Sequence, residues 1–327
     1  MTTPLRRPLA RLDNPSPAEF ERFALRAEPV IIENALGGWK ALADWSVEYF
    51  ARRLGSLPVT FKQSSNHIHP DLGSYYVPPG PLSTWKFLLG RLKPSPLARL
   101  TVRRTTRLDE YLRLLTSSAD AANYYLSGDE LLIYDEGRWS PELAPLREDF
   151  SLPPFFAEEK MLSAGVWVSA KGVRSHLHYD GNGCHNLNAQ VTGEKHVELF
   201  SPDQMDALYP HYVSKLDPMN FSQVNVEDVD PVRFPKFKDA RGFEGTLRAG
   251  DLLFIPAYWY HSFRHLGEFN SNINFWWHPE FVHLSPVAVR AELGRAAAKL
   301  VRKNGWLPPI GLIKWAGRLE HEIIDNE

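Results

Sequence analysis

Residues 186–200 read Asn-Leu-Asn-Ala-Gln-Val-Thr-Gly-Glu-Lys-His-Val-Glu-Leu-Phe, and this stretch decides the fold class. It contains two β-like runs, 186–192 and 195–200, on either side of Gly193. In the first run polar side chains alternate with apolar ones, so one face of the strand is polar and the other is apolar. A polar face inside a folded core is costly unless it lines a wet or ligand-filled site. The stretch therefore predicts a strand whose polar face lines a binding site.

Short runs of the same kind recur after about residue 120, separated by Gly, Pro, Asn and Asp. Many short strands at this spacing indicate a β-barrel or a double-sheet jelly roll. The segment 202–240 is long and rich in Asp, Pro and Phe, and we expect it to be an insertion at the mouth of the barrel. The further predicted strands are Ala164–Ser169, Ser175–Tyr179, Leu252–Ile255, Tyr260–His265 and Asn272–Trp277.

The flanks of this β-rich core have a different pattern. Ser16-Pro-Ala-Glu19 is a helix start with a capping box, and apolar residues return to near-helical spacing from Ser285. The N-terminal third is predicted to hold helices from Ser16 and over 46–54 and 108–115, strands over 30–32 and 59–61, and a long loop over 64–83. The fold class is mainly β with flanking α-helices. The predicted parts are an N-terminal α/β extension over 1–120, a β-rich core over 121–282, and C-terminal helices over 283–327 that form a dimer interface.

The composition excludes several classes of function. The chain has 327 residues and a net charge of -2, which argues against a broad nucleic-acid surface despite the small basic cluster at 103–107. One cysteine, Cys184, allows no internal disulfide and fits a reducing compartment. The N-terminus lacks the apolar stretch of a signal peptide, and no run is long enough for a membrane helix. We expect a cytoplasmic protein without a membrane or nucleic-acid partner.

His178-Tyr179-Asp180 predicts a metal site. Residues two apart in a strand share a face, so His178 and Asp180 can project together into the barrel. The third ligand is expected at His261, which lies 83 residues further on and follows Gly250-Asp251 and Pro256 in a turn–strand context. Two histidines and one carboxylate leave three positions open, which suits non-heme Fe(II), whereas three nitrogen or thiolate ligands would suit zinc. Four other histidines compete for the third position, namely His176, His185, His196 and His265.

Lys195 shares its strand parity with Val197 and Leu199. A lysine on an apolar wall is reasonable if an anionic ligand neutralises it. On the last predicted strand, Asn272, Asn274 and Trp276 repeat the polar alternation of residues 186–190.

The ordered motifs resemble the JmjC hydroxylases, a cupin-like family of Fe(II)- and 2-oxoglutarate-dependent oxygenases. They are most similar to the stand-alone hydroxylases typified by the asparaginyl hydroxylase that acts on the hypoxia-inducible factor. The resemblance covers about residues 120–280 and implies a double-stranded β-helix core. The motifs are His178-Tyr-Asp180, Asn186 to Lys195, Leu199-Phe-Ser-Pro-Asp-Gln, Leu208-Tyr-Pro210, Phe234-Pro-Lys-Phe237, Gly250-Asp251, Ile255-Pro256, Trp259-Tyr-His261 and Asn274-Phe-Trp276.

The resemblance also implies roles for single residues. Lys195 matches the lysine that pairs with the distal carboxylate of 2-oxoglutarate, and Ser175 and Tyr125 match hydroxyl groups that reach the same carboxylate. Asn186 and Asn274 match two asparagines that line the co-substrate pocket. The interval from Asp180 to Asn186 is about two residues longer than the family pattern, which leaves Asn188 as an alternative to Asn186. Tyr258 stands where cupins often have Gly, and His265 where they often have Asn.

The implied activity is hydroxylation. The cofactors would be Fe(II), 2-oxoglutarate as co-substrate and O₂, with succinate and CO₂ as by-products. The expected substrate is a C–H bond of an amino-acid side chain in a protein, a peptide or a small molecule. Asp180 favours hydroxylation over halogenation, because related halogenases leave the carboxylate position to chloride. The alternatives are an N-methyl demethylase of the same chemistry, a metal cupin enzyme that does not use 2-oxoglutarate, and a non-catalytic binding module.

Overall fold

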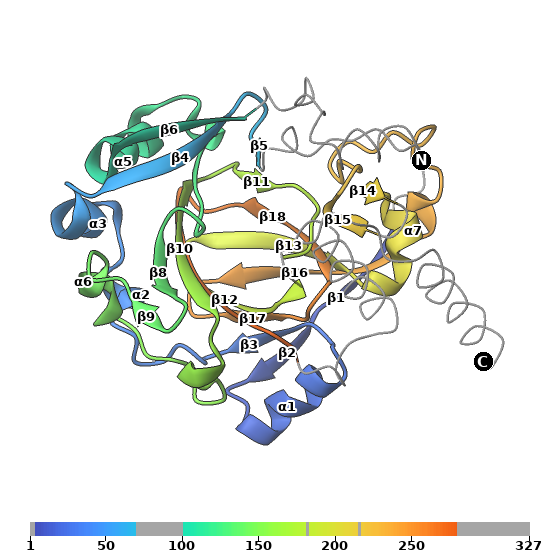
Figure 1. Cartoon of the computed structure of the whole chain (residues 1–327), viewed down its shortest axis with the longest axis horizontal. Helices are drawn as coiled ribbons and strands as arrows, with labels where there is room; N and C mark the ends of the chain where they lie inside the picture. The colour runs from blue at the N-terminus through green and yellow to red at the C-terminus, as the bar shows by residue number, and fades with distance from the viewer. Residues whose placement is uncertain (1–3, 70–100, 181–182, 215–216, 280–327) are drawn as a thin grey trace, which may run out of the picture.

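The computed structural model describes residues 4–69, 101–180, 183–214 and 217–279, which form two large sheets, a small one and short helices (Figure 1). The eleven-stranded sheet contains β2 (Ala10–Asp13), β3 (Val30–Glu33), β4 (Pro58–Ser64), β6 (Thr101–Arg107), β7 (Tyr124–Leu126), β8 (Leu132–Asp135), β9 (Arg138–Trp139), β10 (Ser163–Ala170), β12 (His185–Thr192), β17 (Leu252–Ile255) and β19 (Phe269–Trp277). The six-stranded sheet contains β1 (Leu5–Pro8), β5 (Ile68–His69), β11 (Arg174–Ser175), β13 (Glu194–Phe200), β16 (Arg241–Arg248) and β18 (Tyr260–His265).

The smaller elements follow the same chain order. β14 (Pro210–Ser214) and β15 (Asp217–Ser222) form the two-stranded sheet. The α-helices are α1 (Pro17–Leu25), α2 (Ala41–Asp44), α3 (Val47–Leu54), α5 (Leu108–Ser117), α6 (Ala144–Arg147) and α7 (Met205–Leu208). The 3-10 turns are η3 (Ala121–Asn123), η4 (Glu158–Lys160), η6 (Pro202–Gln204) and η7 (Phe237–Asp239). Within the described part of the chain, no helix has the length and apolar character needed to cross a bilayer.

The strand orders confirm a mainly β jelly-roll core with flanking helices. The larger sheet runs β2-β3-β17-β12-β19-β10-β7-β4-β6, with β8 and β9 attached beside β10. The smaller one runs β1-β16-β13-β18-β11-β5. Strands far apart in the sequence are neighbours in both sheets, as in a double-stranded β-helix. The first three strands extend these two sheets, because β1 pairs with β16 and β3 pairs with β17.

The main hydrophobic core lies between the larger sheet and the N-terminal helices. Leu187, Ala189 and Val191 of β12 are fully buried there, in one cluster with Phe20 of α1 and Phe50 of α3. Figure 1 shows these helices on the outside of the sheet. Burial of this apolar face stabilises the sheet, because each large side chain removed from water contributes about 1.5–3 kcal/mol.

A second apolar cluster fills one part of the space between the two sheets. Val197 and Leu199 of β13 pack there against Leu253 and Ile255 of β17. Lys195 lies on the same face of β13, nearer its start. The interior therefore changes along β13 from an apolar filling to a polar cavity.

The helix starts and most strand positions predicted from the sequence are confirmed. Ser16 caps α1 and Glu19 completes the capping box, since each side chain bonds the other's backbone N–H. Ser46 caps α3, and its side chain accepts a hydrogen bond from the backbone of Tyr49. The strands predicted over 252–255 and 260–265 have the predicted bounds.

The predicted strand Ser175–Tyr179 is wrong after Ser175. The backbone of His176 donates to His69, His178 pairs with both Phe221 and His261, and Tyr179 donates to Asn220. After Ser175 the chain leaves the β18–β11–β5 ladder, and residues 177–179 pair instead with residues 220–222 of β15. No single strand therefore runs from Ser175 to Tyr179. His178 still faces the site, whereas Leu177 and Tyr179 are buried in a separate apolar cluster.

The predicted insertion 202–240 holds short structured elements, η6, α7, β14, β15 and η7. Strand β16 was not expected from the sequence. Its Gly242 and Gly245 interrupt the pattern because Phe200 and Ile31 leave no room for a Cβ. Most of the predicted loop 64–83 and the predicted C-terminal helices lie outside the described residues, and the part boundaries at 120 and 282 remain predictions.

Candidate metal centre and adjoining cavity

The structure brings His178, Asp180 and His261 together. One ligand atom from each of the three lies within 4.8 Å of the other two. His261 Nε2 is 3.6 Å from Asp180 Oδ1, and the two imidazole centroids are 4.5 Å apart. The backbones of His178 and His261 exchange hydrogen bonds, with N···O distances of 3.0 and 2.6 Å. The two histidines are thereby held side by side on paired backbone segments.

Each of these two histidines has one ring nitrogen fixed by the backbone. His178 Nδ1 lies 2.7 Å from the carbonyl of His176, and His261 Nδ1 lies 3.0 Å from the carbonyl of Trp259. A carbonyl only accepts, so the proton of each ring lies on Nδ1. Nε2 then carries a lone pair, which is the form that binds a metal ion.

The carboxylate of Asp180 is oriented in the same way. Its Oδ2 accepts hydrogen bonds from Asn186 Nδ2 at 2.7 Å and from Trp276 Nε1 at 3.0 Å. Asn186 and Trp276 are directly opposite each other on β12 and β19. The two donors form a rigid pair that leaves Oδ1 facing His261.

Burial favours the uncharged imidazole of His178, which is the form that binds a metal ion. Burial and, next in size, the neighbouring His261 together lower the pKa of His178 to about 3. His178 is therefore neutral at physiological pH. Two imidazoles and one carboxylate are the donor set of a facial triad with open positions.

A cavity adjoins the three residues. It encloses about 340 Å³, including its open mouth. Its wall is mostly polar and comes from both sheets. The lining residues are Tyr125, Trp167, Ser175, His178, Asp180, Asn188, Lys195, His261, Phe263, His265, Asn272 and Asn274.

Lys195 is the cationic group of this cavity. Its side chain is 2% exposed, and burial lowers its pKa well below the usual value. Nζ donates a hydrogen bond to Asn272 Oδ1 and lies 5.3 Å from the centre of the Phe263 ring. No carboxylate among the described residues compensates this cation. Without a counter-charge, burial disfavours the charged form of Lys195, and an anionic ligand in the cavity would stabilise that form.

Three other residues predicted for the co-substrate also line the cavity. Ser175 Oγ accepts a hydrogen bond from the backbone of Phe263 at 2.8 Å, which leaves its own proton for another acceptor. Burial raises the pKa of Tyr125, so its phenol stays protonated. Asn274 Oδ1 accepts from Asn272 Nδ2 at 2.7 Å. Their roles toward a ligand remain predictions.

The two alternative asparagines of β12 occupy different places. Asn186 holds Asp180, whereas Asn188 lies on the cavity wall opposite Asn274. The Oδ1 atom of Asn188 is buried and has no hydrogen-bond partner among the described residues. The structure thus gives Asn188 the position expected of a ligand-facing asparagine, and Asn186 a position behind the metal ligand.

The competing histidines do not join the metal centre. His176 Nε2 lies 2.8 Å from the carbonyl of Ser222, and His185 Nδ1 accepts from the backbone of Ala257. His196 is on the opposite face of β13 from Lys195. His265 lies in the cavity, with Nδ1 against the hydroxyl of Ser169. Burial, the nearby Lys195 and His69 all lower the pKa of His265, so it is neutral.

Trp167 is a cavity residue that the sequence did not reveal. Its indole lies 5.2 Å from that of Trp276 and packs over Gly128. A Cβ on Gly128 would lie 2.2 Å from the ring, so only glycine fits there. The sequence does place Trp167 on the same face of β10 as Gly165 and Ser169. It gives no sign of the contact with Gly128, because the two residues meet only in the folded structure.

Comparison with known proteins agrees with this geometry. The family described as the cupin-like domain matches residues 16–283. The chain is 27% identical to lysine-specific demethylase 8 of Xenopus tropicalis over 274 residues, which cover 82% of this chain and 52% of that protein. It is 26% identical to JmjC domain-containing protein D of Dictyostelium discoideum over 271 residues, covering 78% of this chain and 53% of that protein.

A third relative has a different name. The chain is 33% identical to tRNA wybutosine-synthesizing protein 5 of Danio rerio over 185 residues, which cover 54% of each protein. The chain spans about half the length of these curated relatives. With a family match over most of its length and a triad in the cavity of a jelly roll, the chain belongs to the cupin-like domain family, as a protein of the JmjC type.

Proposed function

We propose that the chain is an Fe(II)- and 2-oxoglutarate-dependent dioxygenase that hydroxylates a C–H bond of an amino-acid side chain in a protein, a peptide or a small molecule. The observation that carries the proposal is the buried Lys195 in the same cavity as the His178–Asp180–His261 triad. A metal site alone fits many cupins. An uncompensated cation beside it calls for an anion that binds next to the metal.

The donor set fits Fe(II). His178, Asp180 and His261 would hold the ion through Nε2, Oδ1 and Nε2, since each opposite atom already has a partner. Three ligands on one side of the ion leave room for a chelating co-substrate and O₂. Fe(II) and 2-oxoglutarate together supply O₂ activation, in which 2-oxoglutarate loses CO₂ to give succinate and one oxygen atom enters the substrate C–H bond.

The chain's own residues would bind 2-oxoglutarate and orient it beside the metal. Lys195 would neutralise the distal carboxylate of 2-oxoglutarate, and the hydroxyl groups of Ser175 and Tyr125 can donate to it. Lys195 is paired with His265 across β13 and β18, and His265 is four residues from His261. At about 3.3 Å per residue, the backbone of His261 is about 13 Å along β18 from the backbone of His265, beside which Lys195 lies. The side chains of His261 and Lys195 then extend inward from these two points. A short dicarboxylate fits between such ends.

A second activity is supported by the relatives. Relatives from Xenopus tropicalis, Danio rerio and Arabidopsis thaliana are named lysine-specific demethylases. N-methyl demethylation uses the same hydroxylation chemistry on an N-methyl group, followed by loss of formaldehyde. Release of formaldehyde along with succinate would separate this activity from stable hydroxylation of a side chain.

The test uses the anaerobic full chain loaded with Fe(II) and titrated with 2-oxoglutarate, with the visible charge-transfer absorption of the chelate as readout. We expect saturable binding that Lys195→Ala weakens by about 30-fold or more, because a buried charge pair loses one partner. Lys171→Ala is the matched control, since Lys171 is an exposed lysine paired with Glu268. His178→Ala should abolish the absorption.

The outcomes separate the alternatives. Iron binding without the absorption would show a metal cupin that does not use 2-oxoglutarate. Equal affinities for the wild type and Lys195→Ala would remove Lys195 from the co-substrate site. A protein that binds no iron would leave the non-catalytic binding module as the better hypothesis.

A further inference from the structure

A second cluster of possible metal ligands lies on the outer face of β13. His196 and Glu198 are two residues apart on this strand, and Glu244 of β16 is directly opposite Glu198. One ligand atom of each lies within 4.8 Å of the other two, as in the His178–Asp180–His261 triad. The side chains are 23%, 17% and 44% exposed, so the cluster is half-buried and open on one side.

The distances in this cluster suit a bridging ion better than a hydrogen bond. His196 Nε2 is 3.9 Å from Glu198 Oε1 and 3.7 Å from Glu244 Oε2. Both values exceed the roughly 2.7–3.2 Å of an N–H···O hydrogen bond. Nitrogen and oxygen ligands about 2.1 Å from a tetrahedral zinc ion lie about 3.4 Å from each other. The inner triad offers a comparison in the same molecule, because its His261–Asp180 distance is 3.6 Å.

The carboxylate of Glu198 is oriented like that of Asp180. Arg6 Nη2 holds Glu198 Oε2 at 2.8 Å, which leaves Oε1 to face His196. In the inner site, Asn186 and Trp276 hold Asp180 Oδ2 and leave Oδ1 to face His261. A carboxylate with one oxygen fixed by a donor and the other pointed at an imidazole is the arrangement of an oriented ligand.

The charges also call for a cation. Glu198 and Glu244 face each other across two strands, and like charges in that position destabilise a sheet. Arg6 compensates one of the two carboxylates. Arg264, the cross-strand neighbour of His196, lies 3.8 Å from Glu227 and is compensated there. With the His196 imidazole uncharged, as a metal ligand must be, one negative charge remains at the cluster.

We propose that His196, Glu198 and Glu244 form a second divalent-cation site, which binds Zn²⁺ on the outer face of the six-stranded sheet. One imidazole and two carboxylates supply three ligands, and the fourth position faces solvent. Imidazole in the set favours zinc over magnesium or calcium, which prefer oxygen ligands alone. The site is independent of the proposed oxygenase activity, since it lies on the opposite face of β13 from Lys195.

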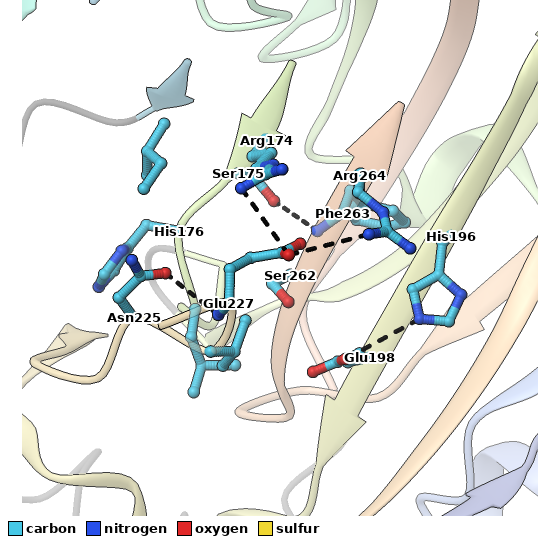
Figure 2. A pocket seen from close by; sticks show the side chains of 13 residues that line it. Arg174, Ser175, His176, His196, Glu198, Asn225, Glu227, Ser262, Phe263 and Arg264 are labelled. Atoms are coloured by element: carbon cyan, nitrogen blue, oxygen red, sulfur yellow. Dashed lines mark hydrogen bonds and ion pairs between the residues drawn. The ribbon is translucent and has the colours of Figure 1, made fainter. Parts of the chain in front are cut away.

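Two members of the cluster, His196 and Glu198, also line a groove that Figure 2 shows from close by. Arg174 and Glu227 line the same groove, and Glu244 is not among its lining residues. The groove encloses about 370 Å³, including its open mouth. A hydrated ion can reach the cluster from this side without entering the inner cavity.

The experiment counts zinc bound by the metal-free full chain after equilibrium dialysis, in a background that lacks the inner site. His178→Ala with Asp180→Ala removes the inner triad, and this variant should retain one Zn²⁺ per chain. Addition of His196→Ala should abolish that zinc, and addition of Glu244→Gln should weaken its binding by about 100-fold or more. Glu227→Gln is the matched control, because Glu227 lines the same groove outside the cluster, and it should retain one Zn²⁺.

Each other outcome overturns the proposal. The site is absent if the background variant binds no zinc at micromolar concentration. Zinc binding is non-specific if Glu227→Gln loses as much zinc as Glu244→Gln, or if His196→Ala loses none. Glu244→Gln keeps the shape of a partly exposed side chain, so its circular dichroism and melting temperature check that the fold is intact.

Discussion

The two faces of β12 are equally buried and chemically opposite. Leu187, Ala189 and Val191 on one face are 0% exposed, and the polar residues Asn186, Asn188 and Gln190 on the other are at most 2% exposed. The apolar face packs against the main core. On the polar face, the side-chain amide oxygen of each of these three residues has no hydrogen-bond partner among the described residues. Buried acceptors of this kind are rare in a finished core, so the comparison shows that burial stabilises the fold on one face and prepares a binding site on the other.

The largest expected effect comes from the apolar face. Leu187→Ala should lower the free energy of unfolding by about 2–5 kcal/mol, because it leaves a cavity in a close-packed core. Metal affinity should change by less than about twofold where the protein is still folded. Urea denaturation and a metal titration of the same preparation measure the two quantities. A large loss of metal affinity with an unchanged free energy of unfolding would contradict the separate roles of the two faces of β12.

The polar face should show the reverse. Asn186→Ala removes one of the two donors to Asp180 Oδ2, and we expect metal affinity to fall by about 10- to 100-fold. Trp276→Phe removes the other donor and should have an effect of similar size. Asn188→Ala is the control, because Asn188 lines the cavity without contacting Asp180. An equal loss of metal affinity in Asn188→Ala would contradict this assignment.

The buried histidines should make stability depend on pH. Burial lowers the pKa of His69 to about 4, and burial also lowers the pKa of His265. The unfolded chain binds their protons near pH 6.5, so the stabilising contribution is present above that pH and is lost as the pH falls toward 4. Each histidine contributes up to about 1.4 kcal/mol per pH unit in that window. Denaturation of the metal-free protein from pH 7 to 5 measures the slope, and His69→Gln should reduce it. An unchanged slope in this variant would show that folding does not lower the pKa of His69.

The smallest effect is expected from a polar group that serves only the fold. Ser16→Ala removes the capping box of α1 and should lower the free energy of unfolding by about 1 kcal/mol. Metal and 2-oxoglutarate affinities should stay unchanged, since α1 lies outside the larger sheet. Thermal denaturation together with the metal titration checks both statements. A loss of affinity would mean that the polar face of β12 depends on helix packing.

Local patterns predicted the parts of the site that a single strand determines. The alternation of residues 186–190 identified the polar face of β12, and the turn before His261 identified that residue as the companion of His178. The break after Ser175 could not be predicted, because His176 and Tyr179 bond residues that are far away in the sequence. The choice between Asn186 and Asn188 was open for the same reason. It depends on how the chain between Asp180 and β12 turns, and the sequence does not encode that turn as a motif.

The pairing of N-terminal strands with C-terminal strands has a consequence for folding of the chain during its synthesis on the ribosome. β1 pairs with β16, β3 with β17, and His178 with His261. In each pair the second partner is synthesised long after the first. Contacts of such long sequence separation form slowly, and unpaired strand edges are prone to aggregate while they wait. The six-stranded sheet and the His178–Asp180–His261 triad cannot be completed until β18 has been synthesised, and the eleven-stranded sheet also requires β19. Binding of the proposed metal by all three ligands would therefore be a late step of maturation.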